Sequence, residues 1–179
     1  MTDRRPLVVL VGPPGSGKTS VGRALAARLG VDLHDTDAAV EDSAGESVAD
    51  IFVVHGEAHF RALEAAEVTA ALTRERGVLA LGGGAVMTPA VRDALAGHRV
   101  VFLDVGIADA AIRIGFDRSR PLLAVNPRAT WVALMAARRQ VYEQVATWRV
   151  DTAGRSVEDV ATQVEALLTG AGAAEGSPS

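Results

Sequence analysis

The sequence contains no cysteine and few aromatic residues. Without cysteine, the chain can form neither disulfide bonds nor thiolate-based metal sites. Aromatic residues make up only 4% of the 179 residues, so we expect a core built mainly of valine, leucine and alanine. A chain of this length can bury a substantial core within a single domain.

Long hydrophobic segments and an excess of positive charge are also missing. The apolar run at 7–11, which follows Asp3, Arg4 and Arg5, is too short for a signal-peptide core. No stretch is long enough to span a membrane. The formal net charge of −4 argues against a general nucleic-acid binder. These absences favour a cytoplasmic enzyme or nucleotide switch with no membrane or nucleic-acid partner.

Short apolar segments alternate with helical patterns along most of the chain. We expect strands at 6–11, 31–34, 78–81, 99–105 and 148–151. We expect helices at 19–29, 48–55, 57–76, 127–145 and 157–168, and another starting at 89, after Thr88. This alternation implies an α/β fold with a parallel sheet covered by helices on both faces, whose ligands bind beyond the carboxyl ends of the strands. We predict one domain at 1–170 and a disordered tail at 171–179.

The only lysine of the chain, Lys18, lies in the run "GPPGSGKT" at 12–19. The run fits G-x-x-x-x-G-K-[ST] between an apolar strand and a helix, which is the context of a phosphate-binding loop. Its glycines let backbone N–H groups surround a phosphate, and Thr19 offers a hydroxyl to Mg²⁺. The amine of Lys18 can reach the β- and γ-phosphates as a compact charge, where an arginine would need a wider planar fork. A chance glycine-rich turn is the alternative.

A GTP-dependent switch could also use such a loop. The segment "DTAG" at 151–154 fits the D-x-x-G element of these switches, but that element should follow soon after the phosphate loop. The guanine-reading N-K-x-D motif cannot occur, because the only asparagine is Asn126 and the only lysine is Lys18. We therefore interpret "DTAG" as a chance match.

Two carboxylates follow the second expected strand, in "LHDTD". If this segment is extended, Asp35 and Asp37 point to the same side. One could then hold Mg²⁺ while the other accepts a proton from an attacking hydroxyl. In the alternative interpretation, the segment is a polar loop in which Asp37 caps the following helix.

The segment "GEAHFRALE" carries an arginine between two glutamates. Arg61 and Glu64 are three residues apart and Glu57 is one turn earlier, so all three share a helix face. An arginine held by a glutamate suits a bidentate grip on a substrate carboxylate; a solvated ion pair is the simpler alternative. His55 and His59 do not form an H-E-x-x-H motif, and we expect no zinc site there.

Two further segments could contact ligands. The three glycines in "LGGGAV" at 81–86 would let the backbone approach a ligand closely, or they form a plain tight turn. The segment at 113–123 places Arg113, Arg118 and Arg120 in one expected loop. Such a loop could close over a nucleotide and bring positive charge to the transferred phosphate, or it is a solvated basic loop.

Together these segments resemble shikimate kinases over 7–168. The matching segments are "GPPGSGKT", "DTD", "GEAHFRALE", "VLALGGGAV", "RPLLA" and "ALMAARRQVYEQVA". The resemblance implies a monomeric enzyme of aromatic amino-acid biosynthesis that transfers the γ-phosphoryl group of MgATP to the 3-hydroxyl of shikimate. It also implies a three-layer P-loop kinase fold with a five-stranded parallel sheet, a substrate-binding region at about 35–64 and a mobile lid at about 113–126. A related small-molecule kinase, such as a gluconate kinase, and a non-catalytic nucleotide-binding module remain alternatives.

The resemblance also implies roles for individual residues. The implied catalytic residues are Lys18, the proton acceptor Asp37 and the lid arginine Arg120. The implied metal ligands are Thr19 and Asp35. The implied nucleotide contacts are Gly15, Ser16, Gly17, Lys18, Thr19, Ser20, Arg113 (against adenine), Arg120 and Arg155. The implied substrate contacts are Asp37, Arg61, Gly83, Gly84 and Arg138 (or its neighbour Arg139), with Phe52 and Phe60 lining the pocket.

Overall fold

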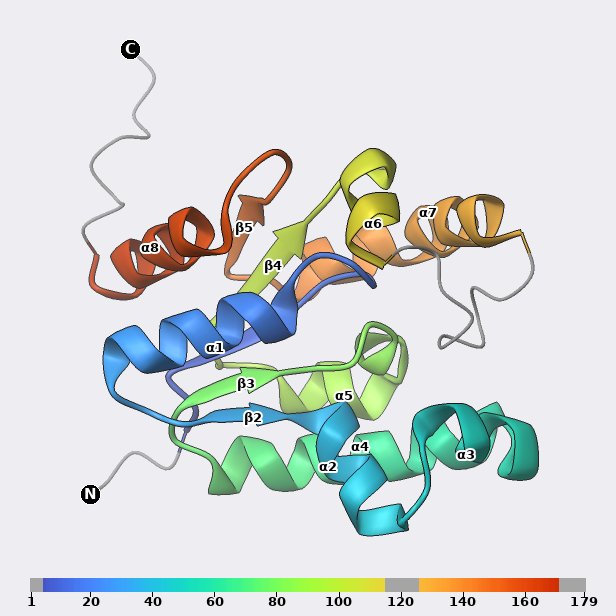
Figure 1. Ribbon diagram of the computed structural model, residues 1–179. Coiled ribbons are helices and arrows are strands. Elements are labelled where there is room, and N and C mark those ends of the chain that lie inside the picture. The colour runs from blue at the N-terminus through green and yellow to red at the C-terminus, as the bar shows by residue number, and fades with distance from the viewer. Residues whose placement is uncertain (1–4, 115–125, 171–179) are drawn as a thin grey trace.

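A computed structural model describes residues 5–114 and 126–170, and the strands of this part form one parallel sheet (Figure 1). The strands are β1 (Val8–Val11), β2 (Leu33–Asp35), β3 (Val78–Ala80), β4 (Val100–Asp104) and β5 (Trp148–Asp151). Their order in the sheet is β2-β3-β1-β4-β5, and every neighbouring pair is parallel. The predicted α/β class and the five-stranded parallel sheet are confirmed.

Helices cover both faces of the sheet (Figure 1). The helices are α1 (Lys18–Leu29), α2 (Thr36–Ala44), α3 (Val48–His55), α4 (Glu57–Arg74), α5 (Pro89–Ala94), α6 (Ile107–Ile114), α7 (Pro127–Val145) and α8 (Val157–Leu168), with a 3₁₀ turn, η1 (Ala85–Met87). Because side chains alternate along a strand, Val8 and Leu10 of β1 pack with α1 and α8, whereas Val9 and Val11 pack with α4, α5 and α7. Most buried hydrophobic residues are valine, leucine or alanine, as predicted.

Most predicted helix boundaries agree with the structure. The hydroxyl of Ser47 accepts a hydrogen bond from the Asp50 amide at 3.1 Å, and that of Ser156 accepts one from the Asp159 amide at 3.1 Å, so these serines cap α3 and α8, which start at the predicted residues. Thr88 is the N-cap residue of α5, although its side chain makes no cap hydrogen bond. Helix α4 ends two residues earlier than predicted, because Glu75 has an extended backbone.

Helices α2 and α6 were not among the expected elements, and each changes the interpretation of a site residue. The alternative interpretation did place a helix after Asp37, but the residue that caps it is Asp35. Strand β2 ends at Asp35, which caps α2 by accepting hydrogen bonds from the amides of Asp37 (3.0 Å) and Ala38 (3.3 Å). The expectation of an extended segment with Asp35 and Asp37 on one side is therefore wrong. Arg113 lies in the last turn of α6 rather than in a loop.

Some predictions fall on residues that the structure does not describe. Most of the expected lid, with Arg118 and Arg120, and the expected tail at 171–179 lie outside the described residues. Among the helices that the structure does describe, none is both long and apolar enough to cross a membrane.

Candidate active site

The phosphate loop connects β1 to α1 at the carboxyl end of the sheet. The amine of Lys18 folds over this loop and donates hydrogen bonds to the carbonyl oxygens of Gly12 (2.8 Å) and Pro13 (3.1 Å). Gly17, with a φ of 89°, occupies the N-cap position of α1. The hydroxyl of Ser16 is buried and has no hydrogen-bond partner among the described residues. A lysine amine, a buried hydroxyl and a helix N-terminus at one place form a site suited to a polyphosphate.

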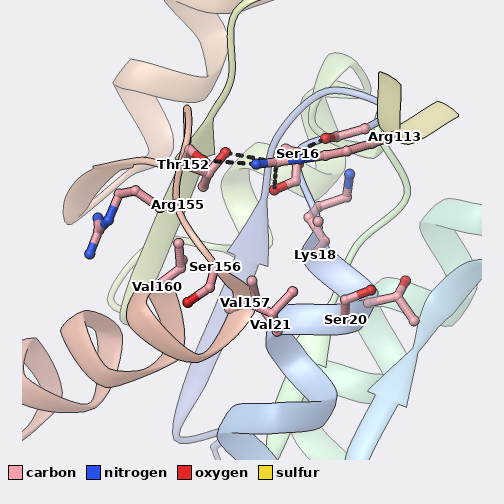
Figure 2. Close-up of a pocket in the computed structure, with 13 residues that line it drawn as sticks. Ser16, Lys18, Ser20, Val21, Arg113, Thr152, Arg155, Ser156, Val157 and Val160 are labelled. Atoms are coloured by element: carbon pink, nitrogen blue, oxygen red, sulfur yellow. Dashed lines mark hydrogen bonds between the residues drawn. The ribbon is translucent and has the colours of Figure 1, made fainter. Parts of the chain in front are cut away.

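A cavity of about 390 Å³ lies beside the phosphate loop (Figure 2). Of the residues predicted to contact nucleotide, those that line it are Gly15, Ser16, Gly17, Lys18, Thr19, Ser20, Arg113 and Arg155. They come from the loop, from α1, from α6 and from the connection between β5 and α8. The structure thus brings together every predicted nucleotide contact within the described residues.

Arg113 connects the two sides of this cavity. Its guanidinium donates to the carbonyl oxygen (2.8 Å) and the hydroxyl (3.0 Å) of Thr152, and to the carbonyl oxygen of Gly15 (3.2 Å). Figure 2 shows Arg113 between Ser16 and Thr152. The Thr152 hydroxyl donates in turn to the Asp104 carbonyl oxygen at 2.9 Å. Thr152 was not predicted as a site residue, because a threonine after a strand carries no signal of its own.

Thr19 and Asp35 lie together at the opening of the phosphate loop. The Thr19 hydroxyl on α1 donates to a carboxylate oxygen of Asp35, at the end of β2, at 2.8 Å. Within the described residues, no group of three histidine or acidic side chains could hold a metal ion. The two oxygen ligands fit Mg²⁺, which commonly takes one or two protein oxygens and completes its shell with water and phosphate.

Asp37 points to a different part of the site from Asp35. A Cβ atom added at Gly82, after β3, would collide with the carboxylates of Asp37 and Glu64, the latter at 2.7 Å. Both carboxylates therefore converge on the glycine turn, and a side chain at position 82 would displace them. Asp35 lies beside Thr19 at the phosphate loop, while Asp37 faces the triple glycine.

Arg61 forms a buried ion pair rather than a solvated one. Its guanidinium lies 2.7 Å from Glu64, whose side chain is only 1% exposed, and 3.5 Å from Glu57. Burial raises the pKa of Glu64, while the charge and hydrogen bond of Arg61 oppose the rise and the charge of Asp37 adds to it. A Cβ atom at Gly84 would come within 2.7 Å of the Arg61 guanidinium, so the glycine turn lies directly on this arginine.

Two phenylalanines surround the same guanidinium. The rings of Phe52 and Phe60 are 4.9 Å apart, and the Arg61 guanidinium carbon lies 6.0 Å and 5.3 Å from their centres. Cation–π attraction and burial restrict the arginine to one orientation. The structure thus places both predicted pocket residues next to Arg61.

The neighbouring arginines of α7 face different surroundings. Arg138 is 6% exposed and interacts electrostatically with Tyr142 and Glu64. Arg139 instead lies 2.7 Å from a carboxylate oxygen of Asp104, at the end of β4. Asp37, Arg61, Glu64 and Arg138 therefore form one group, the carboxylate–arginine cluster.

The carboxylate–arginine cluster and the phosphate loop meet at the triple glycine. A Cβ atom at Gly83 would lie 3.1 Å from the Pro14 ring of the phosphate loop. The indole N–H of Trp131 on α7 donates to the Pro14 carbonyl oxygen at 3.0 Å, and the hydroxyl of Tyr142 donates to the Gly83 carbonyl oxygen. The sequence analysis missed both aromatic residues, although they share the buried face of α7 with Arg138.

A nucleotide cavity at a phosphate loop, joined to a site that can bind a small acid, defines the chain as a phosphotransferase of the P-loop type. The family model for shikimate kinase matches residues 14–169. The chain belongs to the shikimate kinase family.

Individual shikimate kinases are similar to this chain over nearly its whole length. The shikimate kinase of Salinispora arenicola is 56% identical over 163 residues, covering 91% of this chain and 98% of that protein. The shikimate kinase of Thermobifida fusca is 54% identical, covering 94% of this chain and 98% of that protein. The solved structure of shikimate kinase from Acinetobacter baumannii in complex with shikimate has a TM-score of 0.88 at 34% identity, covering 92% of this chain and 93% of that one.

Proposed function

We propose that this enzyme transfers the γ-phosphoryl group of MgATP to the 3-hydroxyl of shikimate, a step of aromatic amino-acid biosynthesis. Its family consists of ATP-dependent kinases that act on an alcohol group of shikimate. The observation that carries the proposal is the contact between the phosphate loop and the triple glycine, at Pro14 and Gly83. This contact sets a phosphate donor site next to the carboxylate–arginine cluster.

Two arginines bind the carboxylate of the acceptor. Arg61 and Arg138 come from different helices, and both interact with Glu64. The buried Glu64 holds Arg61 by a 2.7 Å ion pair, so this guanidinium is oriented before the substrate arrives. A planar guanidinium matches a carboxylate through two parallel hydrogen bonds. The amides of Gly83 and Gly84 and the rings of Phe52 and Phe60 complete the substrate site.

The phosphate loop binds the donor. Lys18 exchanges its carbonyl contacts at Gly12 and Pro13 for the β- and γ-phosphates, and the buried hydroxyl of Ser16 donates to the same phosphates. Thr19 and Asp35 would hold Mg²⁺, which neutralises phosphate charge when bound. The adenine lies in the cavity between Arg113 and the loop that carries Arg155. Arg120 lies outside the described residues, and its place at the transferred phosphoryl group stays a prediction from the family resemblance.

Asp37 acts on the acceptor hydroxyl. Its carboxylate accepts a hydrogen bond from the 3-hydroxyl and takes the proton as the new P–O bond forms. The bond from the γ-phosphorus to the bridging oxygen breaks at the same time, and that oxygen leaves with ADP. The transferred group passes through a loose transition state with charge on its outer oxygens, which Lys18 stabilises.

The proposal is tested by measuring ADP release from the full chain with several acceptors. The panel contains shikimate, quinate, gluconate and nucleoside monophosphates, with an acceptor-free reaction as the blank. We expect ADP release above the blank with shikimate, and a much smaller kcat/KM for every other acceptor. A chain that uses gluconate or a nucleotide but not shikimate would contradict the proposal.

A further inference from the structure

Tyr142, the only tyrosine of the chain, connects two parts of the substrate site without belonging to either. Its side chain is fully buried, and its ring stacks on Phe102 with 5.1 Å between the ring centres. Its hydroxyl donates to the carbonyl oxygen of Gly83. It also interacts electrostatically with Arg138, which lies one turn earlier on the buried face of α7. One phenol is therefore coupled to both the glycine turn and a carboxylate-binding arginine.

The hydrogen bond to Gly83 determines where the next amide points. In a planar trans peptide, the carbonyl of Gly83 and the N–H of Gly84 point in opposite directions, and the described chain contains no cis peptide bond. A donor that fixes the Gly83 carbonyl therefore also fixes the Gly84 N–H. Three consecutive glycines have no side chains that could restrict this peptide, so the restriction must come from outside the turn.

The first and last amides of this turn, those of Gly82 and Ala85, are already used. The Gly82 amide donates to the Thr36 hydroxyl at 3.2 Å, and the Ala85 amide donates to the Gly82 carbonyl oxygen at 3.1 Å. Within the part of the chain that the structure describes, the Gly84 amide donates to no protein group. Its hydrogen bond is therefore not taken up by the described part of the protein.

We infer that Tyr142 is a positioning residue for the acceptor: its hydroxyl holds the Gly83–Gly84 peptide and Arg138 in the arrangement that binds substrate. This inference rests on the proposed function. The buried phenol itself does not touch the substrate. It acts through the Gly84 amide and the Arg138 guanidinium, which belong to the acceptor side and not to the nucleotide cavity.

The first test replaces Tyr142 by phenylalanine, which keeps the stacked ring and removes only the hydroxyl. We expect the KM for shikimate to rise about tenfold, the effect of losing a buried hydrogen bond, with a lower kcat and the KM for ATP changed less than about twofold. The matched control is Thr147→Val at the opposite end of the sheet, where the hydroxyl accepts a 3.0 Å hydrogen bond from the Val100 amide. This control should change neither KM.

The second test does not depend on whether the variant folds. Because the chain has one tyrosine, 3-fluorotyrosine introduces a single ¹⁹F NMR signal into the otherwise unchanged enzyme. Saturating shikimate should shift this signal, although the phenol lies behind the glycine turn. A signal that shikimate leaves unmoved, or a Tyr142→Phe enzyme with a wild-type KM for shikimate, would overturn the inference.

The proposed function and the role of Tyr142 would be contradicted by different results. If the unmodified enzyme does not phosphorylate shikimate, the proposed function is wrong and this inference falls with it. If the unmodified enzyme does so and Tyr142→Phe raises the KM values for shikimate and ATP equally, the tyrosine is only structural, and the proposed function stands.

Discussion

Lysine occurs once among the eighteen basic residues of the chain, and it lies in the phosphate loop. The other basic residues are arginines, and several of them form forked or multiple contacts, as Arg113 and Arg149 do. The amine of Lys18 instead fits between two carbonyl oxygens of the loop. A compact ammonium fits a narrow loop, whereas a guanidinium needs room for a planar fork.

The first prediction is that Lys18→Arg lowers kcat/KM by about 10²-fold or more, the usual effect of losing a transition-state donor. The charge is kept, but the wider side chain should not fit the loop. Steady-state kinetics with shikimate and ATP would measure the loss.

Chemical modification provides a control for the Lys18 prediction. An amine-directed reagent has two targets in this sequence, Lys18 and the N-terminal amine, and peptide mapping separates them. Modification of Lys18 should abolish activity, and saturating MgATP should protect it. If Lys18→Arg keeps near-native turnover and ATP affinity, lysine is not required at position 18. The single lysine would then be a chance result of the arginine-rich composition.

The second prediction concerns Asp37. Asp37→Asn preserves shape and removes the proton acceptor, so turnover should fall about 10²–10⁴-fold, the usual range for a general base. ATP affinity should stay the same, because Asp37 faces Glu64 and the glycine turn rather than the phosphate loop. Equilibrium binding of ATP and single-turnover kinetics separate the two effects. A variant that retains turnover would assign proton transfer to another group.

At the scale of elements, α7 contacts both halves of the active site. Its buried face presents Trp131, Met135, Arg138 and Tyr142, at intervals of three or four residues. This spacing places them on one side of a helix, so a single rigid element contacts the phosphate loop through Trp131 and the glycine turn through Tyr142. Arg139 is one residue further round the helix and faces Asp104 instead.

The third prediction uses the adjacent arginines of α7 as a matched pair. Arg138→Ala should weaken binding of shikimate by about 2–5 kcal/mol, because the substrate carboxylate loses a desolvated partner. Arg139→Ala should leave the KM for shikimate unchanged, since its guanidinium binds Asp104. Kinetics of both variants measure the difference. A larger effect of Arg139→Ala on the KM for shikimate would reverse the assignment.

At the scale of the whole molecule, Asp104 joins three elements. Its carboxylate, at the end of β4, accepts hydrogen bonds from Arg139 of α7 at 2.7 Å and from Arg149 of β5 at 2.8 Å. Burial by itself would raise the pKa of Asp104, but the hydrogen bonds and charges of both arginines outweigh it and hold the pKa below its usual value. The ionised carboxylate therefore stabilises the folded state.

The fourth prediction follows from the direction of this shift. A carboxyl whose pKa is lower in the folded state stabilises the fold above its unfolded-state pKa, which is about 3.9. That stabilisation is lost as the pH falls through the lower, folded-state pKa. The difference in unfolding free energy between the wild type and Asp104→Asn should thus be largest near neutral pH and shrink in acid. Urea unfolding across this pH range measures it.

The control for the Asp104 prediction is Asp93→Asn, at an exposed position of α5. The unfolding free energy of Asp93→Asn should differ little from that of the wild type at every pH. A difference for Asp104→Asn that does not change with pH would mean that the ion pairs with Arg139 and Arg149 add no stability to the fold.

The sequence by itself determined the phosphate loop, the order of the strands and of most helices, and the pairing of Arg61 with Glu64. Each of these features depends on residues that are close together in the chain. The glycines define the loop, the apolar pattern defines the strands and helices, and the helical spacing brings Arg61 and Glu64 together. Only the tertiary structure decided that Asp35 and Asp37 face different parts of the site, because the end of β2 and the cap of α2 set their directions. It also placed Arg138 near Glu64 and Arg139 against Asp104, and it revealed Tyr142. Their directions depend on how α7 packs against loops more than 50 residues away, and local sequence does not encode that packing.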